Sequence, residues 1–336
     1  MRLGLIARMD KTGLGYQTKA FYDHLKPHKT MVLDISASNG NVEQHRGWYQ
    51  DAYFIQGFPT KDQIQRFLMD LDIVFTCETP YNYELYTIAK AMGVKTVNQY
   101  NPEFFDYFKY NYPTPDLLIA PSMWLFQEVD NWCKQNKVKH KYIHLPVDRD
   151  VFKYRPRTSP RTMHIAGKPA AHDRNGTWEY MHSVPNGIVV TQSEDLAKQI
   201  RQRYRMCNVF TGIANPQNMY EFADVLVLPR KYGGNCLPMN EALSCGMPVI
   251  MPDISPNNQF LPKEWLVPAQ ITGSFIPRVK VDLYTCNPQD LKAKIDEIRT
   301  WNMLEESEKA NEIAERISWR NMKQVYLDAF QEVCDS

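Results

Sequence analysis

The residues best placed to do chemistry lie between 222 and 253. Two adjacent glycines, Gly233-Gly234, follow an apolar strand expected at 224–228 and precede a helix. Glycine lets the backbone adopt positive φ and approach a ligand closely, and helix amides that open onto such a turn attract anions. Inside that helix Glu241 would repel a phosphate, but its carboxylate can accept from two vicinal ribose hydroxyls. The alternative is an acid at the helix N-terminus that the helix dipole stabilises.

A basic group follows the strand expected at 162–167. Lys168 and Arg174 lie in the next loop, and both side chains stay cationic. The guanidinium fork of arginine suits phosphate oxygens. The pair is therefore a candidate for binding phosphate, and the alternative is that both are solvated loop charges. Arg230, just before the glycines, is a third candidate.

The N-terminal part carries its own candidates. Gly13 and Gly15 follow a buried strand expected at 2–8 and precede an expected helix. Doubly wound domains begin with this succession of strand, glycine loop and helix. The alternative for both glycines is a purely structural turn. Glu78 follows the strand at 72–76, where its carboxylate would bind a ligand hydroxyl or cap the helix after Pro80.

These candidates are positioned by regularly alternating strands and helices. The first part of the chain predicts strands at 2–8, 31–35, 53–56, 72–76, 95–99, 117–120 and 141–145, with helices at 61–70, 81–92 and 122–136. Such spacing favours parallel sheets covered by helices, an α/β class. A length of 336 residues suits two domains, which we place at 1–150 and 151–317.

Composition narrows the function classes. The 39 basic and 38 acidic residues nearly cancel, so no overall field points to nucleic acid or membrane. Seven scattered cysteines lack zinc spacing and predict reduced thiols in the cytoplasm. No apolar run approaches the ~18 residues of a membrane span. The prolines and arginines at 155–161 predict an exposed linker.

The stretch 233–250 resembles a nucleotide-sugar motif, E-G-F-G-L-P-x-L-E-A-L-A-x-G-x-P-V-I. That motif is typical of family-four retaining glycosyltransferases of GT-B fold. Its second glutamate matches Glu241, its first is replaced by Gly233, and Arg230 stands where a serine often follows the strand's proline. Residues 145–152 and the Ser318-Trp319 helix start are also similar to the family.

The resemblance implies a fold. It predicts two Rossmann-like doubly wound domains facing a cleft, with residues 1–150 on the acceptor side and 151–317 binding the nucleotide sugar. It also predicts that the C-terminal helix, 318–336, crosses back to pack on the first domain.

The resemblance also implies residue roles. Glu241 would hold the donor ribose, and Lys168 and Arg174 would act on the departing diphosphate, with Glu78 near the acceptor. Cys77 stands about where many members carry a histidine. The remaining donor-binding candidates are Gly13, Gly15, Gly212, Ile213, Arg230, Gly234, Cys236 and Leu237.

The expected function is a metal-independent retaining glycosyltransferase. It would move a hexose-type sugar from a UDP- or GDP-sugar to a hydroxyl of a small molecule or glycan, without a cofactor. One alternative is a sugar-nucleotide-binding relic without turnover, because Gly233 and Cys77 depart from the family. Others are a GT-B epimerase or phosphorylase. A further alternative acts on hydroxymethylated bases in DNA. The stretch 229–234 resembles phage-type members, and together with the arginines at 155–161 and 201–205 it could make a basic face.

Overall fold

The computed structural model describes residues 1–36, 44–105 and 113–336. The chain divides into two compact units. Residues 1–145 together with 319–336 form the first, and residues 146–318 form the second. The division falls between 145 and 146, whereas the sequence placed it between 150 and 151.

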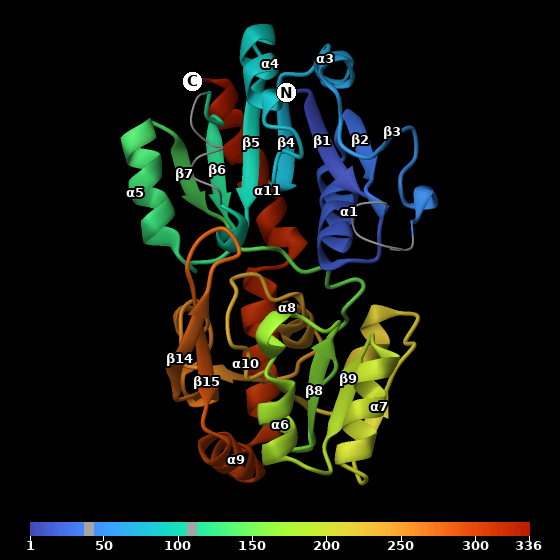
Figure 1. The fold of residues 1–336 in the computed structure, drawn as a ribbon, viewed down its shortest axis with the longest axis vertical. Coiled ribbons are helices and arrows are strands. Elements are labelled where there is room, and N and C mark those ends of the chain that lie inside the picture. The colour runs from blue at the N-terminus through green and yellow to red at the C-terminus, as the bar shows by residue number, and fades with distance from the viewer. Residues whose placement is uncertain (37–43, 106–112) are drawn as a thin grey trace. The chain divides into compact units, whose positions relative to one another are not determined.

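The first unit is built on a parallel sheet, shown in the upper part of Figure 1. Its described strands are β1 (Leu3–Arg8), β2 (Lys29–Asp34), β3 (Tyr53–Gln56), β4 (Ile73–Glu78), β5 (Lys95–Tyr100), β6 (Leu117–Ala120) and β7 (Lys139–Tyr142). Their order is β3-β2-β1-β4-β5-β6-β7. The chain therefore reverses its direction of growth between β1 and β4, and ligands of such sheets bind at this switch point.

Helices cover this sheet. They are α1 (Gly13–Leu25), α3 (Lys61–Leu68), α4 (Glu84–Met92), α5 (Phe126–Asn136) and the C-terminal α11 (Trp319–Cys334). The ring of Phe21 in α1 lies edge-on to Trp319 and Tyr326 of α11, with centroids 5.2 and 5.1 Å apart. The predicted return of the C-terminal helix to the first domain is thus confirmed.

Two helices begin later than the sequence predicted. The prediction started them at 81 and 122, but α4 begins at Glu84 and α5 at Phe126. Tyr81 and Leu125 adopt left-handed conformations, with φ of 61° and 52°. A helix cannot propagate through such residues, so each helix starts only after them.

The second unit repeats the doubly wound plan. Its strands are β8 (Thr162–Gly167), β9 (Ile188–Thr191), β10 (Asn208–Phe210), β11 (Val225–Val227), β12 (Val249–Pro252) and β13 (Leu266–Val267), in the order β10-β9-β8-β11-β12-β13. The order reverses between β8 and β11. An antiparallel hairpin, β14 (Ala269–Phe275) and β15 (Val281–Cys286), is added to this plan.

The helices of the second unit are α6 (Thr177–Ser183), α7 (Glu194–Arg203), α8 (Leu237–Ser244), α9 (Pro288–Glu297) and α10 (Met303–Arg316). A proline in its first turn starts α8, and Gly246, with a φ of 75°, follows its end. A Cβ on Gly246 would lie 2.7 Å from the carbonyl oxygen of Arg155, so a larger residue does not fit.

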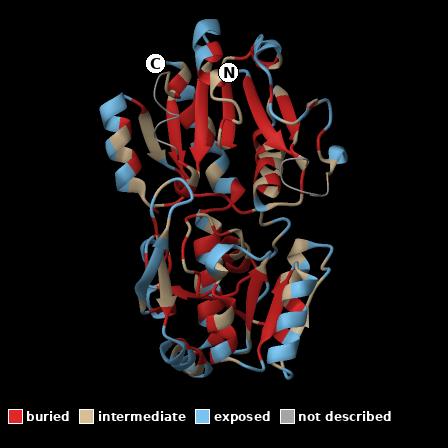
Figure 2. Cartoon of the chain, viewed as in Figure 1, coloured by how far each residue is buried: buried red, intermediate tan, exposed pale blue. Residues whose placement is uncertain are grey.

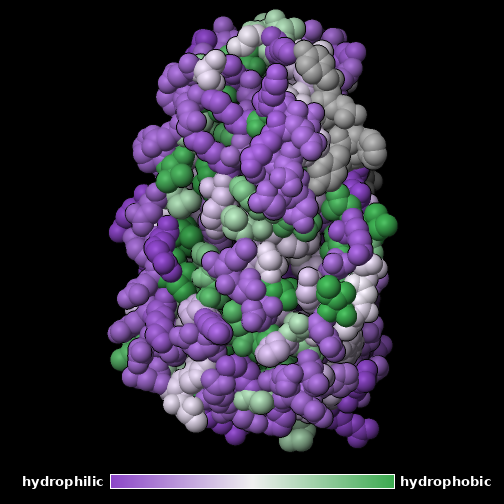
Figure 3. Space-filling view, turned by 90° about the vertical axis from the view of Figure 1, so that its left-hand side faces the viewer, coloured by the Kyte–Doolittle hydropathy of each residue, from purple (hydrophilic) through white to green (hydrophobic). Residues whose placement is uncertain are grey.

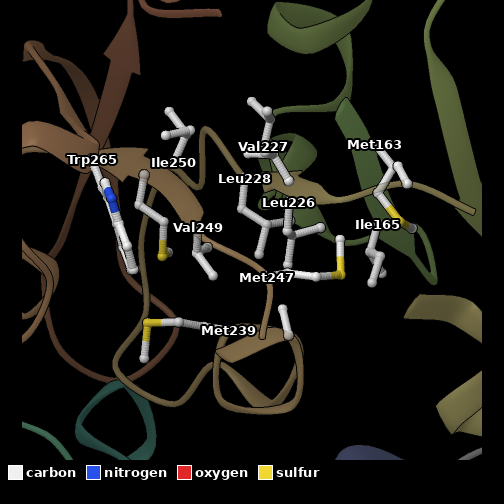
Figure 4. Close-up of a cluster of buried hydrophobic side chains, with 14 of the residues drawn as sticks. Met163, Ile165, Leu226, Val227, Leu228, Met239, Met247, Val249, Ile250 and Trp265 are labelled. Atoms are coloured by element: carbon white, nitrogen blue, oxygen red, sulfur yellow. The ribbon is translucent and has the colours of Figure 1, made fainter. Parts of the chain in front are cut away.

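Each unit buries its central strands, which are red in Figure 2, whereas β3, β7, β10 and the β14–β15 hairpin are partly exposed. In the second unit the core joins α8 to the central strands: Figure 4 shows Met239 of α8 in one cluster with Leu226 and Val249. This packing holds α8 against the central strands, with β12 in direct contact, and therefore fixes the side chains that α8 carries.

Hydrophilic side chains cover most of the face in Figure 3, and apolar residues are scattered among them. In the part of the chain that the structure describes, none of the helices is long and apolar enough to cross a membrane.

Candidate functional site

Glu241 lies in the second turn of α8 and is half-buried. The hydroxyl of Tyr220 donates a hydrogen bond to its Oε2. Tyr220 belongs to a short 3₁₀ helix, η4 (Pro216–Glu221), and is 1% exposed. The alternative that Glu241 stabilises the helix N-terminus does not hold, because α8, all of it described, has no acid in its first turn.

Burial tunes the charge of this pair. It raises the pKa of the Glu241 carboxyl to about 7, and the hydrogen bond from Tyr220 opposes the rise. Burial also raises the pKa of the Tyr220 phenol well above its usual value. Tyr220 is therefore a hydrogen-bond donor at neutral pH, while Glu241 changes charge close to neutrality.

Arg157 supports both partners of this pair from within the unit. Its Nη1 donates to the carbonyl of Tyr220 at 3.0 Å and of Ala223 at 2.9 Å. Its Nε and Nη2 donate to the carbonyl of Cys245 at 2.9 and 2.8 Å. The amide of Cys245 donates to the backbone carbonyl of Glu241 at 3.0 Å, so one guanidinium joins η4 to the end of α8.

The predicted exposed linker at 155–161 is therefore wrong at its centre. Arg157 is 1% exposed, and burial lowers its pKa to about 10. Alternating prolines and arginines resemble a linker in composition, but the carbonyls that gather around Arg157 come from elements more than 60 residues away. Arg155 and Arg161 are exposed as predicted.

Two guanidinium groups converge on Gly233. A Cβ built on this glycine would lie 2.3 Å from Nη2 of Arg174 and 2.6 Å from Nη2 of Arg230. Gly233 also has a φ of 109°, which strongly favours glycine. Arg230 is 7% exposed and donates its Nε to the carbonyl of Tyr232 at 3.0 Å. The position of the motif's missing first acid is thus occupied by positive charge.

Aromatic and backbone contacts hold the arginines in place. Arg174 lies over the ring of Tyr232, 4.9 Å from its centroid, and its carbonyl accepts from the amide of Lys231 at 2.8 Å. Lys231 in turn pairs with Glu179 at 2.8 Å. Lys231 is therefore neutralised by its partner, which distinguishes it from Arg230, for which no ion pair appears among the described residues.

Lys168 and Arg174 share a cavity. A space of about 310 Å³ between the loop after β8 and the start of α7 is lined by both residues and by Trp178 and Leu196. Lys168 is exposed and Arg174 half-buried. The two predicted diphosphate ligands thus lie on one surface of the second unit.

The first unit places polar groups where β1 and β4 end. Arg8 and Asp10 form a buried ion pair at 2.5 Å, and Asp10 also accepts from the amide of Thr12 at 3.1 Å. A Cβ on Gly15 would lie 1.8 Å from the carbonyl oxygen of Asp10. The alternative of a purely structural turn therefore explains why a glycine is needed at this position. Gly13 is the exposed first residue of α1.

Glu78 ends β4 in a left-handed conformation, with a φ of 67°. Its Oε1 accepts from Nδ2 of Asn101 at 3.0 Å. The alternative that Glu78 caps the following helix is wrong, because Asn82 accepts from the amide that begins α4. A strained acid at a strand end, held by an amide, is typical of a binding site.

Solved structures similar to the chain show which fold this is. A glycosyltransferase from Rickettsia africae matches at 12% identity over 98% of both chains, with a TM-score of 0.72. HepE of Anabaena in complex with UDP matches at 12% identity over 99% of this chain and 100% of that one, with a TM-score of 0.70. A sucrose-phosphate synthase of Thermosynechococcus elongatus matches at 12% identity over 98% of both chains, with a TM-score of 0.66. No protein-family model and no curated protein matches the sequence.

The chain has the GT-B fold.

In GT-B terms, the predicted site residues fall into three groups. Glu241 lies beside Tyr220, while Cys236 caps α8 and Leu237 begins it. The basic group has Arg174 and Arg230 beside Gly233, and Lys168 in a shared cavity with Arg174. Glu78, Gly13 and Gly15 belong to the first unit.

The loop from 230 to 236 connects the first two groups, because it begins at Arg230 and leads directly into α8. Of the two glycines, Gly233 alone has a positive φ, while Gly234 is buried. Gly212 has a φ of 66° with open space at its Cβ, and half-buried Ile213 packs on the core. Both follow β10 in the loop that leads to η4.

Sequence reasoning missed Tyr220 and the role of Arg157. Tyr220 lies 21 residues before its partner, in a segment whose apolar residues serve the core equally well. A pattern in one sequence could not have found this pair, because its contact depends on how η4 packs against α8.

Proposed function

We propose that this protein is a glycosyltransferase that uses a nucleotide-sugar donor. It transfers a hexose-type sugar from a UDP- or GDP-sugar to a hydroxyl of a small molecule or glycan, with retention of configuration. The observation that carries the proposal is the acid of α8, held by Tyr220, directly after the loop where two arginines converge. The similar fold of HepE, which has been solved with UDP and with UDP-glucose, supports it.

The second unit would bind the donor. Glu241 would accept hydrogen bonds from the two ribose hydroxyls, since an ionised carboxylate has the lone pairs to do so. The backbone at Gly212 and Ile213 would contact the base. Both positions lie along the chain from β10 to α8, which also supplies Tyr220.

The basic group would act on the diphosphate. As the sugar departs, negative charge grows on the leaving phosphate, and fixed cations stabilise it. Lys168, Arg174 and Arg230 would supply those cations, with the amides near Cys236 and Leu237 at the start of α8. Side chains would then do the work that a divalent ion does in other transferases, so we expect no metal requirement.

The first unit would bind the acceptor. Glu78, oriented by Asn101 at the ends of β4 and β5, would accept from the acceptor hydroxyl. With retention by front-face departure and attack, the leaving phosphate itself would take the acceptor's proton. Glu78 would therefore orient the acceptor more than it would deprotonate it.

A panel of nucleotide sugars tests the function. UDP-, GDP-, ADP- and dTDP-sugars are compared for the rise in melting temperature, and the best is followed for release of free sugar without acceptor. Stabilisation with slow hydrolysis supports a transferase. Stabilisation without any hydrolysis or transfer supports the binding relic, a different sugar product supports an epimerase, and no stabilisation by any donor contradicts the proposal.

The DNA acceptor loses part of its basis. Arg157 is buried, so it cannot contribute to a basic face made by the residues at 230–231, 155–161 and 201–205. Arg201 donates to the carbonyl of Val209 at 2.8 Å, and Arg203 lies over the ring of Trp178 at 5.6 Å. Retention on duplex DNA that falls steeply with salt, with sugar transfer to hydroxymethylated DNA, would restore it.

The compartment belongs to the same proposal. All seven cysteines are free thiols. Thiols persist in a reducing cytoplasm. We therefore propose a cytoplasmic location, and fractionation of the host cell tests it.

A further inference from the structure

The hydrogen bond between Tyr220 and Glu241 commits one oxygen of the acid. A phenol has a single hydrogen to donate, and that of Tyr220 is directed to Oε2. No hydrogen bond to Oε1 is found among the described residues. The carboxylate is therefore fixed on one side and has its other oxygen left for a ligand.

The backbone of both partners is fixed by Arg157. Its guanidinium makes hydrogen bonds to the carbonyls of Tyr220, Ala223 and Cys245, at 2.8 to 3.0 Å. The Arg157 amide also donates to Oγ of Ser307 at 3.0 Å, which ties the segment to α10. Such a network leaves η4 little freedom to move relative to α8.

We propose that Tyr220 is a positioning residue that orients the Glu241 carboxylate for the donor ribose, and that Arg157 fixes the two elements that carry them. The inference rests on the proposed function, because it takes Glu241 as the ribose ligand. The inference goes beyond the proposed function, because it assigns a role to a buried phenol that the ligand does not need to contact.

A purely structural role for Tyr220 makes a different prediction. The ring packs edge-on against Phe152 at 5.8 Å, so Tyr220 also contributes to the core. Phenylalanine would keep that packing and remove only the hydroxyl. If the hydroxyl orients Glu241 and favours its ionised form, the loss must appear in the pH dependence of binding.

The direction of that dependence follows from the environment. The titratable and charged groups around the pair are Tyr220 and Glu221 of η4, Cys236 and Cys245 at the ends of α8, and Arg155 and Arg157. Burial raises the pKa of Glu241 to about 7 and the Tyr220 hydrogen bond lowers it, so the pKa rises further when the hydroxyl is removed. Burial raises the pKa of the Cys245 thiol to about 12, so this thiol stays neutral in the range tested.

The experiment measures the dissociation constants of UDP, GDP and ADP from pH 5.5 to 9 for the wild type, Tyr220→Phe and Glu241→Gln. The terminal phosphate of the ligand has a pKa near 6 and so titrates in the same range. Glu241→Gln cannot ionise at position 241, so its pH profile shows the contribution of the ligand alone. The affinity of each protein at each pH is divided by that of Glu241→Gln at the same pH. This ratio should decrease for the wild type as the pH drops below about 7. Tyr220→Phe should begin to fall at higher pH, with about 3- to 10-fold weaker binding at pH 7 and a difference of under about 2-fold at pH 9.

Tyr180→Phe is the matched control, because Tyr180 is fully buried in the same unit and its hydroxyl reaches a backbone carbonyl at 3.5 Å. It should leave the profile unchanged. An unshifted midpoint in Tyr220→Phe, or an equal loss at every pH, overturns the positioning role. If Glu241→Gln itself binds like the wild type at every pH, the proposed ribose contact fails instead, so the two failures are distinguishable.

Discussion

A Cβ atom on Gly233 would lie 2.3 Å from Nη2 of Arg174. Nη2 of Arg230 lies 2.6 Å from the same point. The absence of a side chain at this position is what lets two guanidinium groups approach each other. Like charges held this close favour an anion between or beside them, which is the role we give to the donor diphosphate.

Gly233→Ala should therefore displace both arginines. We expect affinity for UDP to fall by roughly 10-fold or more, since charge-assisted hydrogen bonds contribute about 1.5–3 kcal/mol each. Affinity for uridine should change much less. Calorimetry with the two ligands measures the difference.

Gly57→Ala is the control for this change, because Gly57 also has a positive φ, 77°, but open space around its Cβ. Both variants carry the cost of a strained alanine, and only Gly233→Ala crowds the arginines. Equal losses for UDP and uridine in Gly233→Ala would show that it disturbs the whole site instead.

Glu241→Ala should weaken donor binding by roughly 10- to 100-fold, because two hydrogen bonds to one carboxylate are lost together. A donor with 2′-deoxyribose offers one hydroxyl fewer, so it should lose less on the same substitution. Isothermal titration with UDP and its 2′-deoxy analogue measures both effects. A folded variant with unchanged UDP affinity would contradict the ribose contact.

Arg174→Ala should lower turnover more than it weakens nucleoside binding, since charge grows on the diphosphate in the transition state. Steady-state kinetics with the preferred donor, beside the dissociation constant of the nucleoside, measure the two losses. Lys231→Ala is a neighbouring change of charge at a residue already paired with Glu179, and it should affect turnover less. Equal losses of turnover and nucleoside binding in Arg174→Ala would show that Arg174 contributes only to ground-state binding.

Glu241→Gln should stabilise the ligand-free protein at alkaline pH. The folded pKa of Glu241 is raised from 4.5 to about 7. Between these values the folded state holds a proton that the unfolded state has lost, so the free energy of unfolding falls as pH rises. The glutamine cannot ionise, so its advantage over the wild type should grow from pH 5 to pH 8, by on the order of 1–3 kcal/mol.

Thermal unfolding of both proteins across this range measures the effect. Asp150→Asn, which removes an exposed acid of the same unit, should show no such growth. A constant difference between Glu241→Gln and the wild type at all pH values would contradict the raised pKa.

Arg157→Met should destabilise the second unit by about 3–5 kcal/mol, because it removes the donors from three buried carbonyls. Arg161→Ala, at an exposed position of the same segment, should stay within about 0.5 kcal/mol. Urea unfolding measures both. A mild effect of Arg157→Met would mean that water or a local rearrangement replaces the guanidinium.

Much of the fold follows from local patterns in the sequence. The apolar runs at 72–76 and 224–228 became β4 and β11, because strands covered on both faces need uninterrupted apolar residues. The limits of α8 also have a local cause, because Pro238 lies in its first turn and Gly246 follows its end.

The site was less predictable, because its decisive contacts are not local. The sequence indicated Glu241, Lys168 and Arg174 as candidates, yet it could not show that Tyr220 faces the acid. Nor could composition show that an arginine between prolines is buried, since that depends on carbonyls at helix ends far along the chain. Left-handed residues such as Leu125, which delayed a helix, are equally invisible in a helical pattern.

The return of α11 to the first unit affects how the chain is made. Phe21 and Phe75 form an aromatic face that Tyr326 and its neighbours cover, but those residues are synthesised only after the whole of 146–318. At about 5–20 residues per second, a growing chain would carry this uncovered face for roughly 10–35 s. During that interval the nascent first unit is an apolar target for chaperones and for other growing chains on the same messenger RNA.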